Sequence, residues 1–508
     1  WVNDGVIVDM NGGVAEVVNC DAAGERSFFN LATSDAVIFS KEYHNAWLNQ
    51  GGSENIRIKS VSRPGWRHVG WSTDRNCSVA NATSITWRQS TLGNVTVYAV
   101  WEALATVDMQ GGTARVVNCD AAGDQQRFQL STTYSVYFYD VGGAWVNSGG
   151  DGSGRISGVW RDGYRFRGWS TDPKCAPSIA SSYTWYVKDG AVTLYGIWEA
   201  ILTVDMQGGT AQVVNCDAAG DQQRFQLAAT HAVNFSDGGG AWVNSGGDGS
   251  VRVNGVWRTG YRFCGWSTDA KCAAKDAGAY QWLRADGPKT LYAIWSPILT
   301  IDLNGGKATV GKTGQEVATY AVDETMGNVD GLTLHEGGTS WYFLGEPLLS
   351  VRKDSRPGYA FYGWAAKADA KEGGTINYHV SEGPTTVYAV WRPILTVDMQ
   401  GGTVRLLANS SAVGTATWSS YSGYDFYPSG DIWNTTGDHL ASGPQRTGYR
   451  FSGYSRDKAG EPSASSLRVS VTEPTTVYAI WSPITYSVRF DPAGGSWDGA
   501  LWEDATLS

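Results

Sequence analysis

The segment GYRFRGWSTD, residues 163–172, occurs five times in this 508-residue chain with small changes. The other copies, in chain order, are GWRHVGWSTD at 65, GYRFCGWSTD at 260, GYAFYGWAAK at 358 and GYRFSGYSRD at 448. A catalytic motif is needed once per active site, whereas a segment that recurs at a nearly constant interval builds each of several similar units. The segment therefore predicts a tandem repeat.

Two further motifs recur with this one in a fixed order. An alternating run enters a Gly-Gly turn as VIVDMNGG at 6, ATVDMQGG at 105, LTVDMQGG at 202, LTIDLNGG at 299, LTVDMQGG at 395 and SVRFDPAGG at 487. A closing run such as VTLYGIW ends at Trp101, Trp198, Trp295, Trp391 and Trp481, which are 97, 97, 96 and 90 residues apart. The three motifs define the repeating unit.

We predict five complete units and the start of a sixth. Their ranges are 1–103, 104–200, 201–297, 298–393, 394–483 and, for the truncated sixth unit, 484–508. Trp1 stands eight residues before Asp9, as Trp101 stands seven before Asp108, so Trp1 is expected to be the last residue of a preceding unit. The chain is therefore expected to be part of a longer array.

Composition and pattern favour strands. The chain has 64 Gly, 24 Trp and 25 Tyr, and charged residues make up only 17%, a balance typical of strands and turns. The run LTVDM alternates apolar and polar residues, and the Gly-Gly pair allows a tight turn. We expect a β-dominated fold, α+β at most, with one short helix at most in each unit.

Within the unit, two strands carry specific expectations. Strict alternation in GYRFRGW would place Trp169 on the face of the arginines, and Gly168 predicts a bulge that returns the indole to the core. The run TLYGIW is apolar on both faces, which predicts a central strand. The closing tryptophans and the motif tryptophans are expected in the core.

The three motifs resemble the Listeria–Bacteroides repeat, the B-repeat of internalin-type surface proteins. Its units run roughly V-x-F-D-x-N-G-G, then G-Y-x-F-x-G-W, then T-L-Y-A-x-W, and all five units of this chain follow that order. The resemblance implies a small β-grasp-like module, exported and strung in tandem on a surface or secreted protein. The units here are longer in their middle part, and three of them carry cysteines.

The cysteines follow the repeat. One member of each pair lies in VVNCDAAG and the other follows the GWSTD motif, and no histidine accompanies them in register. A disulfide within each unit is favoured over a metal site, because structural metal sites supply ligands in close pairs. The predicted pairs are Cys20–Cys77, Cys119–Cys175 and Cys216–Cys272. Each bridge would stabilise by about 4 kcal/mol and indicates an oxidising compartment. Cys264 has no partner in this pattern and is expected to be either an idle free thiol or the site of an intermolecular disulfide.

No catalytic, cofactor or metal site is predicted. The six histidines fall at unrelated places in the units and are expected on the surface or in loops. The recurring aspartates beside the Gly-Gly turn, such as Asp108, are expected to form the turn by side-chain hydrogen bonds. The GGDGS runs at 149 and 246 lack the spaced acidic ligands of a calcium loop, and no G-x-S-x-G, P-loop or H-E-x-x-H motif occurs. We expect a protein that is not an enzyme.

A second set of tryptophans lies in the Gly-rich or polar middle of each unit: Trp47, Trp145, Trp242, Trp341 and Trp433. An indole in such a loop can stack on sugar rings or dock a neighbouring subunit, or it can fill its own small core. Asn-x-Ser/Thr sequons, which mark possible N-glycosylation in a competent host, occur at Asn76, Asn81, Asn94, Asn409 and Asn434.

Short joints connect the units. The closing tryptophan and the next strand are separated by a few residues, and Pro297, Pro393 and Pro483 stiffen three joints. We therefore expect an elongated, semi-rigid rod that serves as an extracellular or cell-surface stalk, spacer or adhesin shaft. A self-assembling filament or sheath subunit and a carbohydrate-binding array are the alternatives.

The partners follow from the same features. They are expected to be other repeats of the same chain, copies of itself, or a cell-surface glycan or protein. The net charge of −10 disfavours nucleic acid, and no apolar run is long enough to span a membrane.

Overall fold

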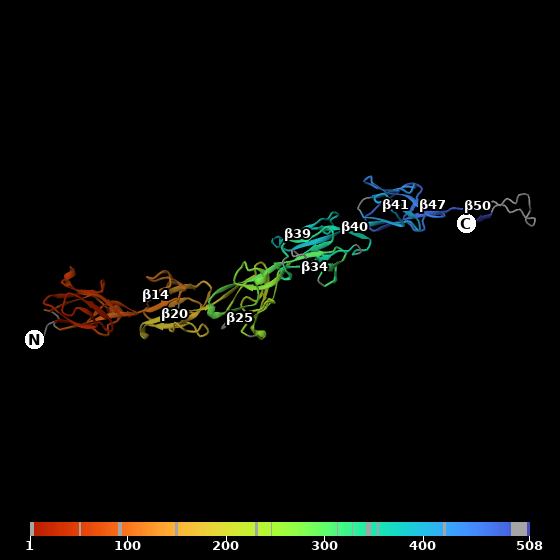
Figure 1. The fold of residues 1–508 in the computed structure, drawn as a ribbon. Coiled ribbons are helices and arrows are strands. Elements are labelled where there is room, and N and C mark those ends of the chain that lie inside the picture. The colour runs from red at the N-terminus through yellow and green to blue at the C-terminus, as the bar shows by residue number, and fades with distance from the viewer. Residues whose placement is uncertain are drawn as a thin grey trace, which may run out of the picture.

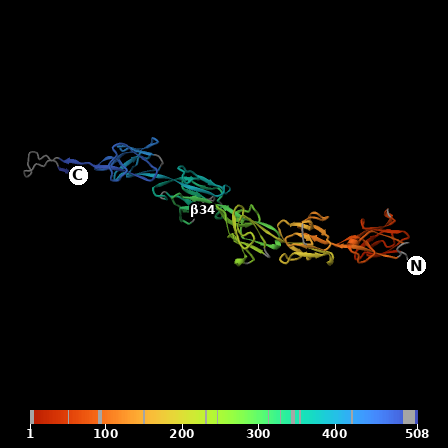
Figure 2. The same ribbon diagram turned by 180° about the vertical axis from the view of Figure 1, so that it is seen from behind.

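The structure is a computed structural model that describes residues 5–49, 52–89, 94–147, 151–228, 232–244, 246–311, 313–327, 329–341, 347–352, 355–419, 423–488 and 505–507. Five groups of strands follow one another in chain order between the two termini (Figure 1). The view from behind shows the same order (Figure 2). The helical elements with described bounds are three-residue 3-10 helices, so the β-dominated fold is confirmed.

The strands of the first three units are these. Unit one has β1 (Gly5–Asp9), β2 (Val14–Val17), β3 (Gly24–Arg26), β4 (Phe28–Ala32), β5 (Ala36–Ser40), β6 (Asn45–Leu48), β7 (Ile56–Ser62), β8 (Trp66–Ser72), β9 (Ile85–Arg88) and β10 (Thr96–Ala103). Unit two has β11 (Ala105–Asp108), β12 (Thr113–Val116), β13 (Gly123–Gln125), β14 (Arg127–Leu130), β15 (Ser135–Phe138), β16 (Ala144–Val146), β17 (Gly154–Trp160), β18 (Tyr164–Ser170), β19 (Tyr183–Tyr186) and β20 (Val192–Ala200). Unit three has β21 (Leu202–Asp205), β22 (Thr210–Val213), β23 (Gly220–Gln222), β24 (Arg224–Leu227), β25 (Ala232–Phe235), β26 (Ala241–Val243), β27 (Val251–Trp257), β28 (Tyr261–Ser267), β29 (Tyr280–Leu283) and β30 (Lys289–Pro297).

The remaining elements follow. Unit four has β31 (Leu299–Asp302), β32 (Ala308–Val310), β33 (Glu316–Val317), β34 (Thr319–Val322), β35 (Leu332–Leu334), β36 (Thr339–Trp341), β37 (Pro347–Ser350), β38 (Tyr359–Ala365), β39 (Ile376–Tyr378) and β40 (Thr385–Asp398). Unit five shares β40 and has β41 (Thr403–Leu406), β42 (Ala412–Val413), β43 (Thr415–Ser419), β44 (Gly423–Phe426), β45 (Ile432–Asn434), β46 (His439–Gln445), β47 (Tyr449–Ser455), β48 (Leu467–Ser470) and β49 (Thr475–Pro483), and β50 (Tyr486–Val488) pairs with β51 (Ala505–Leu507) beyond it. The 3-10 helices are η1 (Ser53–Asn55), η2 (Val79–Asn81), η3 (Asp151–Ser153), η4 (Val187–Asp189), η5 (Asp248–Ser250), η6 (Ala274–Asp276), η7 (Arg284–Asp286), η8 (Glu324–Met326) and η9 (Val380–Glu382).

Each unit consists of two sheets. In unit one the first sheet has the order β4-β1-β10-β8 and the second the order β3-β2-β7-β6-β5-β9. In the first sheet, β1 and β10 pair in parallel at the centre, and the two outer strands are antiparallel to them. The six-stranded order recurs in units two to five and the four-stranded order in units two and three, whereas the four-stranded parts of units four and five share β40 and form one seven-stranded sheet. The closing run forms the strand β10 and its counterparts, which confirms the predicted central strand.

One hydrophobic core fills the space between the two sheets of a unit. In unit two the core side chains come from both sheets and include Val107, Phe138, Ile156, Trp169 and Trp185. Because inward residues alternate with outward ones along each strand, a single sheet could bury only one of its faces. The two sheets therefore stabilise each other.

The closing tryptophan lies on the Gly-Gly turn. The Trp198 indole Nε1–H donates to the Met109 carbonyl oxygen at 2.7 Å. A Cβ on Gly112 would lie 2.2 Å from the Trp198 ring, so only glycine fits beneath the indole. The contact recurs between Gly13, Gly209, Gly306 and Gly402 and the rings of Trp101, Trp295, Trp391 and Trp481. The second glycine of the turn is thus explained by packing.

The aspartate before the turn acts as predicted. The Asp108 carboxylate accepts the backbone N–H of Gln110 at 2.8 Å, and Gln110 and Gly111 both have positive φ. The bond recurs in the other four units, with Asp9, Asp205, Asp302 and Asp398 as acceptors. The recurring carboxylates therefore stabilise the Gly-Gly turn.

The predicted bulge is present. The register of β18 against β20 shifts between Phe166 and Gly168, and Gly168 has a φ of 132°. The shift turns Trp169 inward, where it is 2% exposed and donates its indole N–H to the Tyr139 carbonyl at 2.8 Å. The counterparts Trp71, Trp266, Trp364 and Tyr454 are also buried, so the expected core position is confirmed.

The structure yields a test in unit two. Trp169→Ala should destabilise unit two by about 3–5 kcal/mol, as large core truncations do. Trp145→Ala removes an indole that is only half-buried and should cost far less. Hydrogen exchange of the full chain, read by mass spectrometry, should show faster exchange confined to unit two for Trp169→Ala. Similar exchange for both variants would contradict the assignment.

Candidate functional site

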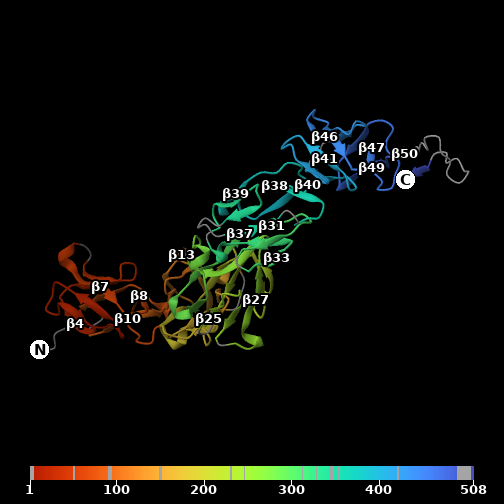
Figure 3. The same cartoon turned by 45° about the vertical axis from the view of Figure 1, so that its right-hand side comes forward.

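The feature that repeats most closely is the joint between consecutive units. One residue separates the last strand of a unit from the first strand of the next at Leu104, Ile201 and Ile298, and β40 runs through the fourth joint without a break (Figure 3). The Leu104 backbone N–H donates to the Gly65 carbonyl oxygen at 3.0 Å. The same bond forms from Ile201, Ile298, Ile394 and Ile484 to Gly163, Gly260, Gly358 and Gly448.

The first half of the recurring motif packs against the following unit. A Cβ on Gly163 would lie 2.5 Å from Cβ of Pro288, which belongs to unit three. The next residue, Tyr164, places its hydroxyl against Gly287 of unit three. The contact recurs from Gly65, Gly260 and Gly358 to Ala191, Pro384 and Pro474. The motif therefore builds the joint with its Gly-Tyr half and the core with its Gly-Trp half.

In all five units an arginine stacks on the aromatic residue in the first half of the motif. The Arg161 guanidinium lies 3.8 Å from the centre of the Tyr164 ring, a cation–π contact. Its side chain also lies over Gly111 of the Gly-Gly turn. The stacking recurs for Arg63 on Trp66, Arg258 on Tyr261, Arg356 on Tyr359 and Arg446 on Tyr449. The arginine thus links the turn to the joint.

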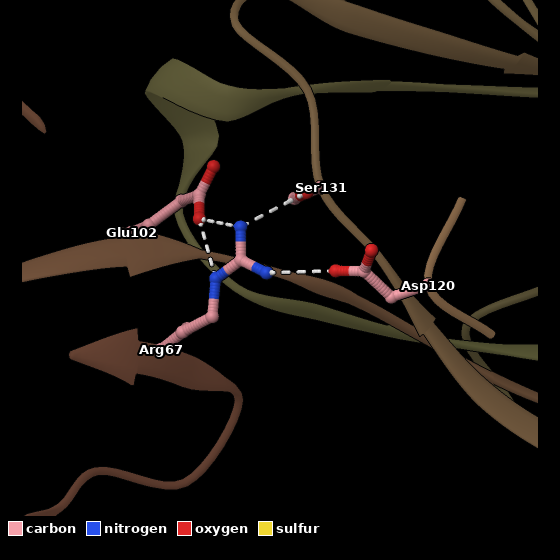
Figure 4. A network of polar contacts seen from close by, with 4 residues as sticks. All are labelled: Arg67, Glu102, Asp120 and Ser131. Atoms are coloured by element: carbon pink, nitrogen blue, oxygen red, sulfur yellow. Dashed lines mark hydrogen bonds and ion pairs between the residues drawn. The ribbon is translucent and has the colours of Figure 1, made fainter. Parts of the chain in front are cut away.

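An arginine of the motif crosses the first joint (Figure 4). Arg67 donates from Nε to the Glu102 carboxylate of its own unit at 2.9 Å. Its other nitrogens reach the Ser131 hydroxyl at 3.3 Å and the Asp120 carboxylate at 3.8 Å, both in unit two. Asp120 is fully exposed, and such pairs contribute little stability, so the network connects the two units without adding much to their stability.

The next two joints have related ion pairs. Arg165 contacts Asp217 of unit three at 3.3 Å, and Arg262 contacts Asp323 of unit four. Asp323 is only 1% exposed, and its carboxylate also accepts the Thr325 backbone N–H at 2.9 Å. In the fourth unit the arginine position holds Ala360, and the uninterrupted β40 connects that joint.

A cavity lies beside each of the first two joints. The larger, of about 1040 Å³, is lined by residues of both units, among them Trp66, Arg67, Cys119 and Phe128. The second, of about 350 Å³, is lined at the corresponding positions by Arg165, Cys216 and Asp217. The hairpin that carries Cys119 in unit two, and the one that carries Cys216 in unit three, therefore form a wall of the joint.

All seven cysteines are free thiols in the structure. Cys119 lies in the wall of the first joint cavity, whereas Cys175 lies in the turn after β18, where its backbone N–H bonds to the Asp172 carbonyl. A disulfide requires Cα atoms roughly 4.4–6.8 Å apart. The three pairs Cys20–Cys77, Cys119–Cys175 and Cys216–Cys272 are not formed, and their pairing stays a prediction.

Cys264 is half-buried beside the third joint. Burial raises the pKa of its thiol, and the nearby Asp323 carboxylate raises the pKa further. A raised pKa keeps the sulfur protonated and lowers its reactivity. The choice between an idle thiol and an intermolecular link stays a prediction.

The tryptophans of the second set lie in strands, which corrects their placement in loops. Trp47, Trp145, Trp242, Trp341 and Trp433 occupy β6, β16, β26, β36 and β45. The side chains of Trp47, Trp145, Trp242 and Trp433 are half-buried, whereas that of Trp341 lies outside the described residues. The loop prediction failed because strands of three or four residues beside glycine or polar residues show little alternation.

The sequon asparagines differ in accessibility. Asn76, Asn81, Asn94 and Asn409 are exposed. The Asn434 side chain is half-buried, because its amide donates to the Asp438 carboxylate at 2.7 Å and its oxygen accepts the Asp438 N–H at 2.7 Å. Asn434 is therefore the sequon least available for modification.

His68 corrects the expectation that the histidines lie on the surface. It is 6% exposed and occupies the motif position that holds Phe166 in unit two. Its Nδ1 lies 3.0 Å from Nδ1 of His44. Burial, with the neighbouring His44, lowers the pKa of His68 to about 3. An alignment of the motif copies would have shown that this histidine replaces a core phenylalanine.

Taken together, the fold and joints define a tandem array of small two-sheet β modules. Residues 134–197, within unit two, match the family model of the Listeria-Bacteroides repeat domain, which confirms the resemblance for that unit. No curated protein matches the chain. Among the residues that the structure describes, no helix has the length and apolar character needed to cross a membrane.

The burial of His68 predicts a pH dependence of unit one. The folded pKa of about 3 lies below the unfolded value of about 6.5. The unfolded chain therefore binds a proton first as the pH falls, and stability is lost between pH 6.5 and about 3. His68→Phe should remove about 3 kcal/mol of this loss at pH 4. Calorimetry of the full chain at pH 7 and pH 4 measures it, and equal acid sensitivity of both proteins would contradict it.

The state of the cysteines is decided by peptide mapping. Non-reducing digestion of protein secreted from an oxidising compartment should yield linked peptides for Cys119 with Cys175 if the predicted bridges form. Recovery of these cysteines as alkylated thiols, bridges between units, or bound zinc would contradict the predicted pairing.

Proposed function

We propose that the protein is an extracellular structural repeat array that serves as a stalk, spacer or adhesin shaft at a cell surface, without enzymatic activity. The observation that carries the proposal is the joint. In units one to four the first half of the recurring motif packs against the next unit, through Gly163 on Pro288 and its counterparts. A chain of independent beads would have no need of such contacts.

The joint contacts favour a semi-rigid rod. A connection of one residue, or none at β40, leaves little backbone freedom. The Leu104–Gly65 bond and the Arg67 network add restraints on bending and rotation. With the proposed domain boundaries, the Leu104–Gly65 bond and the Arg67 network each connect one unit to the next.

Two further assignments belong to the proposal. The units are described as β-grasp-like, because their first and last strands pair in parallel at the centre of the four-stranded sheet. The location outside the cell rests on the match of residues 134–197 to the repeat family and on the tandem architecture.

The rod predicts a length. Five stiff units of about 100 residues, each roughly 40 Å across, should extend about 200 Å. Small-angle X-ray scattering of the full chain should give this maximum dimension. Insertion of a flexible Gly-Ser segment after Leu104 should shorten the average extension and broaden the distribution of distances, since it frees the first joint.

The control is the same insertion in an exposed loop, between Gly246 and Gly247, which should leave the scattering profile unchanged. A compact wild-type particle, or a profile that does not respond to the insertion at the joint, would contradict the stalk.

A further inference from the structure

The outer face of the six-stranded sheet in unit three carries a distinct set of side chains, which we call the amide face. It comprises Trp242, Trp257 and the pairs Asn234–Gln281 and Gln212–Asn254. Ala241, Val253 and Phe235 point into the core, and alternation along the strands places Trp242 and Asn234 on the opposite side. Asn234 lies between Trp242 and Gln281 in the strand register.

The two indoles of the amide face are accessible in different ways. Trp257 is 45% exposed. Trp242 is half-buried because its ring lies over the turn at Gly240, where a Cβ would come within 3.0 Å of Cη2. The intermediate exposure of Trp242 leaves part of the side chain accessible to solvent. Trp242 pairs with Val251, six residues before Trp257 on β27, so the backbone positions of the two tryptophans are roughly 15–20 Å apart along the strand.

The amides form two hydrogen-bonded pairs. Gln281 Nε2 donates to Asn234 Oδ1 at 2.7 Å, and Asn254 Nδ2 donates to Gln212 Oε1 at 2.9 Å. Each bond uses one donor and one acceptor, and an amide has two of each to offer. Gln212, Asn254 and Gln281 are exposed. Hydrogen bonds that orient the amides therefore leave groups of both kinds directed at solvent.

Unit five lacks each of these features at the same sheet positions. The Asn234–Gln281 pair is replaced by an ion pair in which Arg468 donates to Asp425 at 2.7 and 2.8 Å. The Trp433 ring is already stacked on His439, with centroids 4.3 Å apart and an interplanar angle of 1°. The position of Trp257 holds Gln445, in register with Thr403 as Trp257 is with Thr210. Unit five is thus a natural control.

We propose that the amide face of unit three binds a neutral polysaccharide chain. A pyranose ring has apolar C–H faces, which pack on an indole, and hydroxyl edges, which both donate and accept hydrogen bonds. The four amide side chains carry no charge, and the exposed Asp221, in strand register with Gln212, would repel an acidic chain, so the face favours an uncharged ligand. The separation of the indoles fits several sugar units in a row rather than a single sugar. The proposal is independent of the stalk function.

Affinity electrophoresis of the full chain in native gels tests the proposal. The probes are dextran, laminarin and hydroxyethylcellulose as neutral polysaccharides, with alginate as the acidic counterpart. We expect retardation by at least one neutral probe and none by alginate. Trp242→Ala and Gln281→Ala should each weaken binding by about tenfold, which corresponds to the loss of one ring or one oriented amide.

Trp433→Ala is the matched control, since it removes the corresponding indole of unit five and should leave the affinity within about twofold. Gln281→Ala changes an exposed side chain and keeps the test valid should Trp242→Ala disturb the fold. Absence of retardation by all three neutral probes, retardation by alginate alone, or equal loss in Trp433→Ala would overturn the proposal.

Discussion

Each unit depends on the packing of its closing tryptophan ring against the Gly-Gly turn. Trp198 lies at the end of unit two and Gly112 near its start, and the indole fits only because Gly112 lacks a side chain. The contact brings the last strand beside the first, where β11 and β20 pair in parallel. That pairing closes a loop of nearly the whole unit. The chain entropy lost in closing the loop is offset only when both sheets pack against each other.

The first strand of the next unit, β21, begins one residue after β20 ends, so closure of one unit positions its neighbour. The residue after β20, Ile201, donates its N–H to Gly163, and β21 follows at once. The Gly-Tyr half of the motif packs on the next unit, and the Gly-Trp half, five residues on, closes the core of its own. A short segment thereby couples folding within a unit to the orientation of the array.

The sequence predicted what depends on neighbouring residues. The turn aspartate, the bulge at Gly168 and the inward Trp169 follow from spacing and from the conformational freedom of glycine. The two-sheet arrangement could not be predicted, because the pairing of β12 with β17 joins segments about 40 residues apart. The placement of Trp145 in a strand was missed because β16 has only three residues and shows little alternation.

The contacts at the joint also could not be predicted from single residues. Arg165 and Asp217 lie 52 residues apart in different units, and each taken alone is an ordinary surface charge. A signal did exist, since Ala360 replaces the arginine in unit four, and unit five lacks the VVNCDAAG segment that carries the aspartate. Comparison of the motif copies across the joint would have connected the two positions.

The most direct test of this account is Gly112→Ala in the full chain, measured by hydrogen exchange. The added methyl group would lie 2.2 Å from the Trp198 ring, and overpacking of this kind costs about 1–3 kcal/mol. The account predicts faster exchange in β11 and β20 of unit two, with units four and five unchanged. Exchange in β11 and β20 equal to that of the wild type would contradict the central role of the indole on the turn.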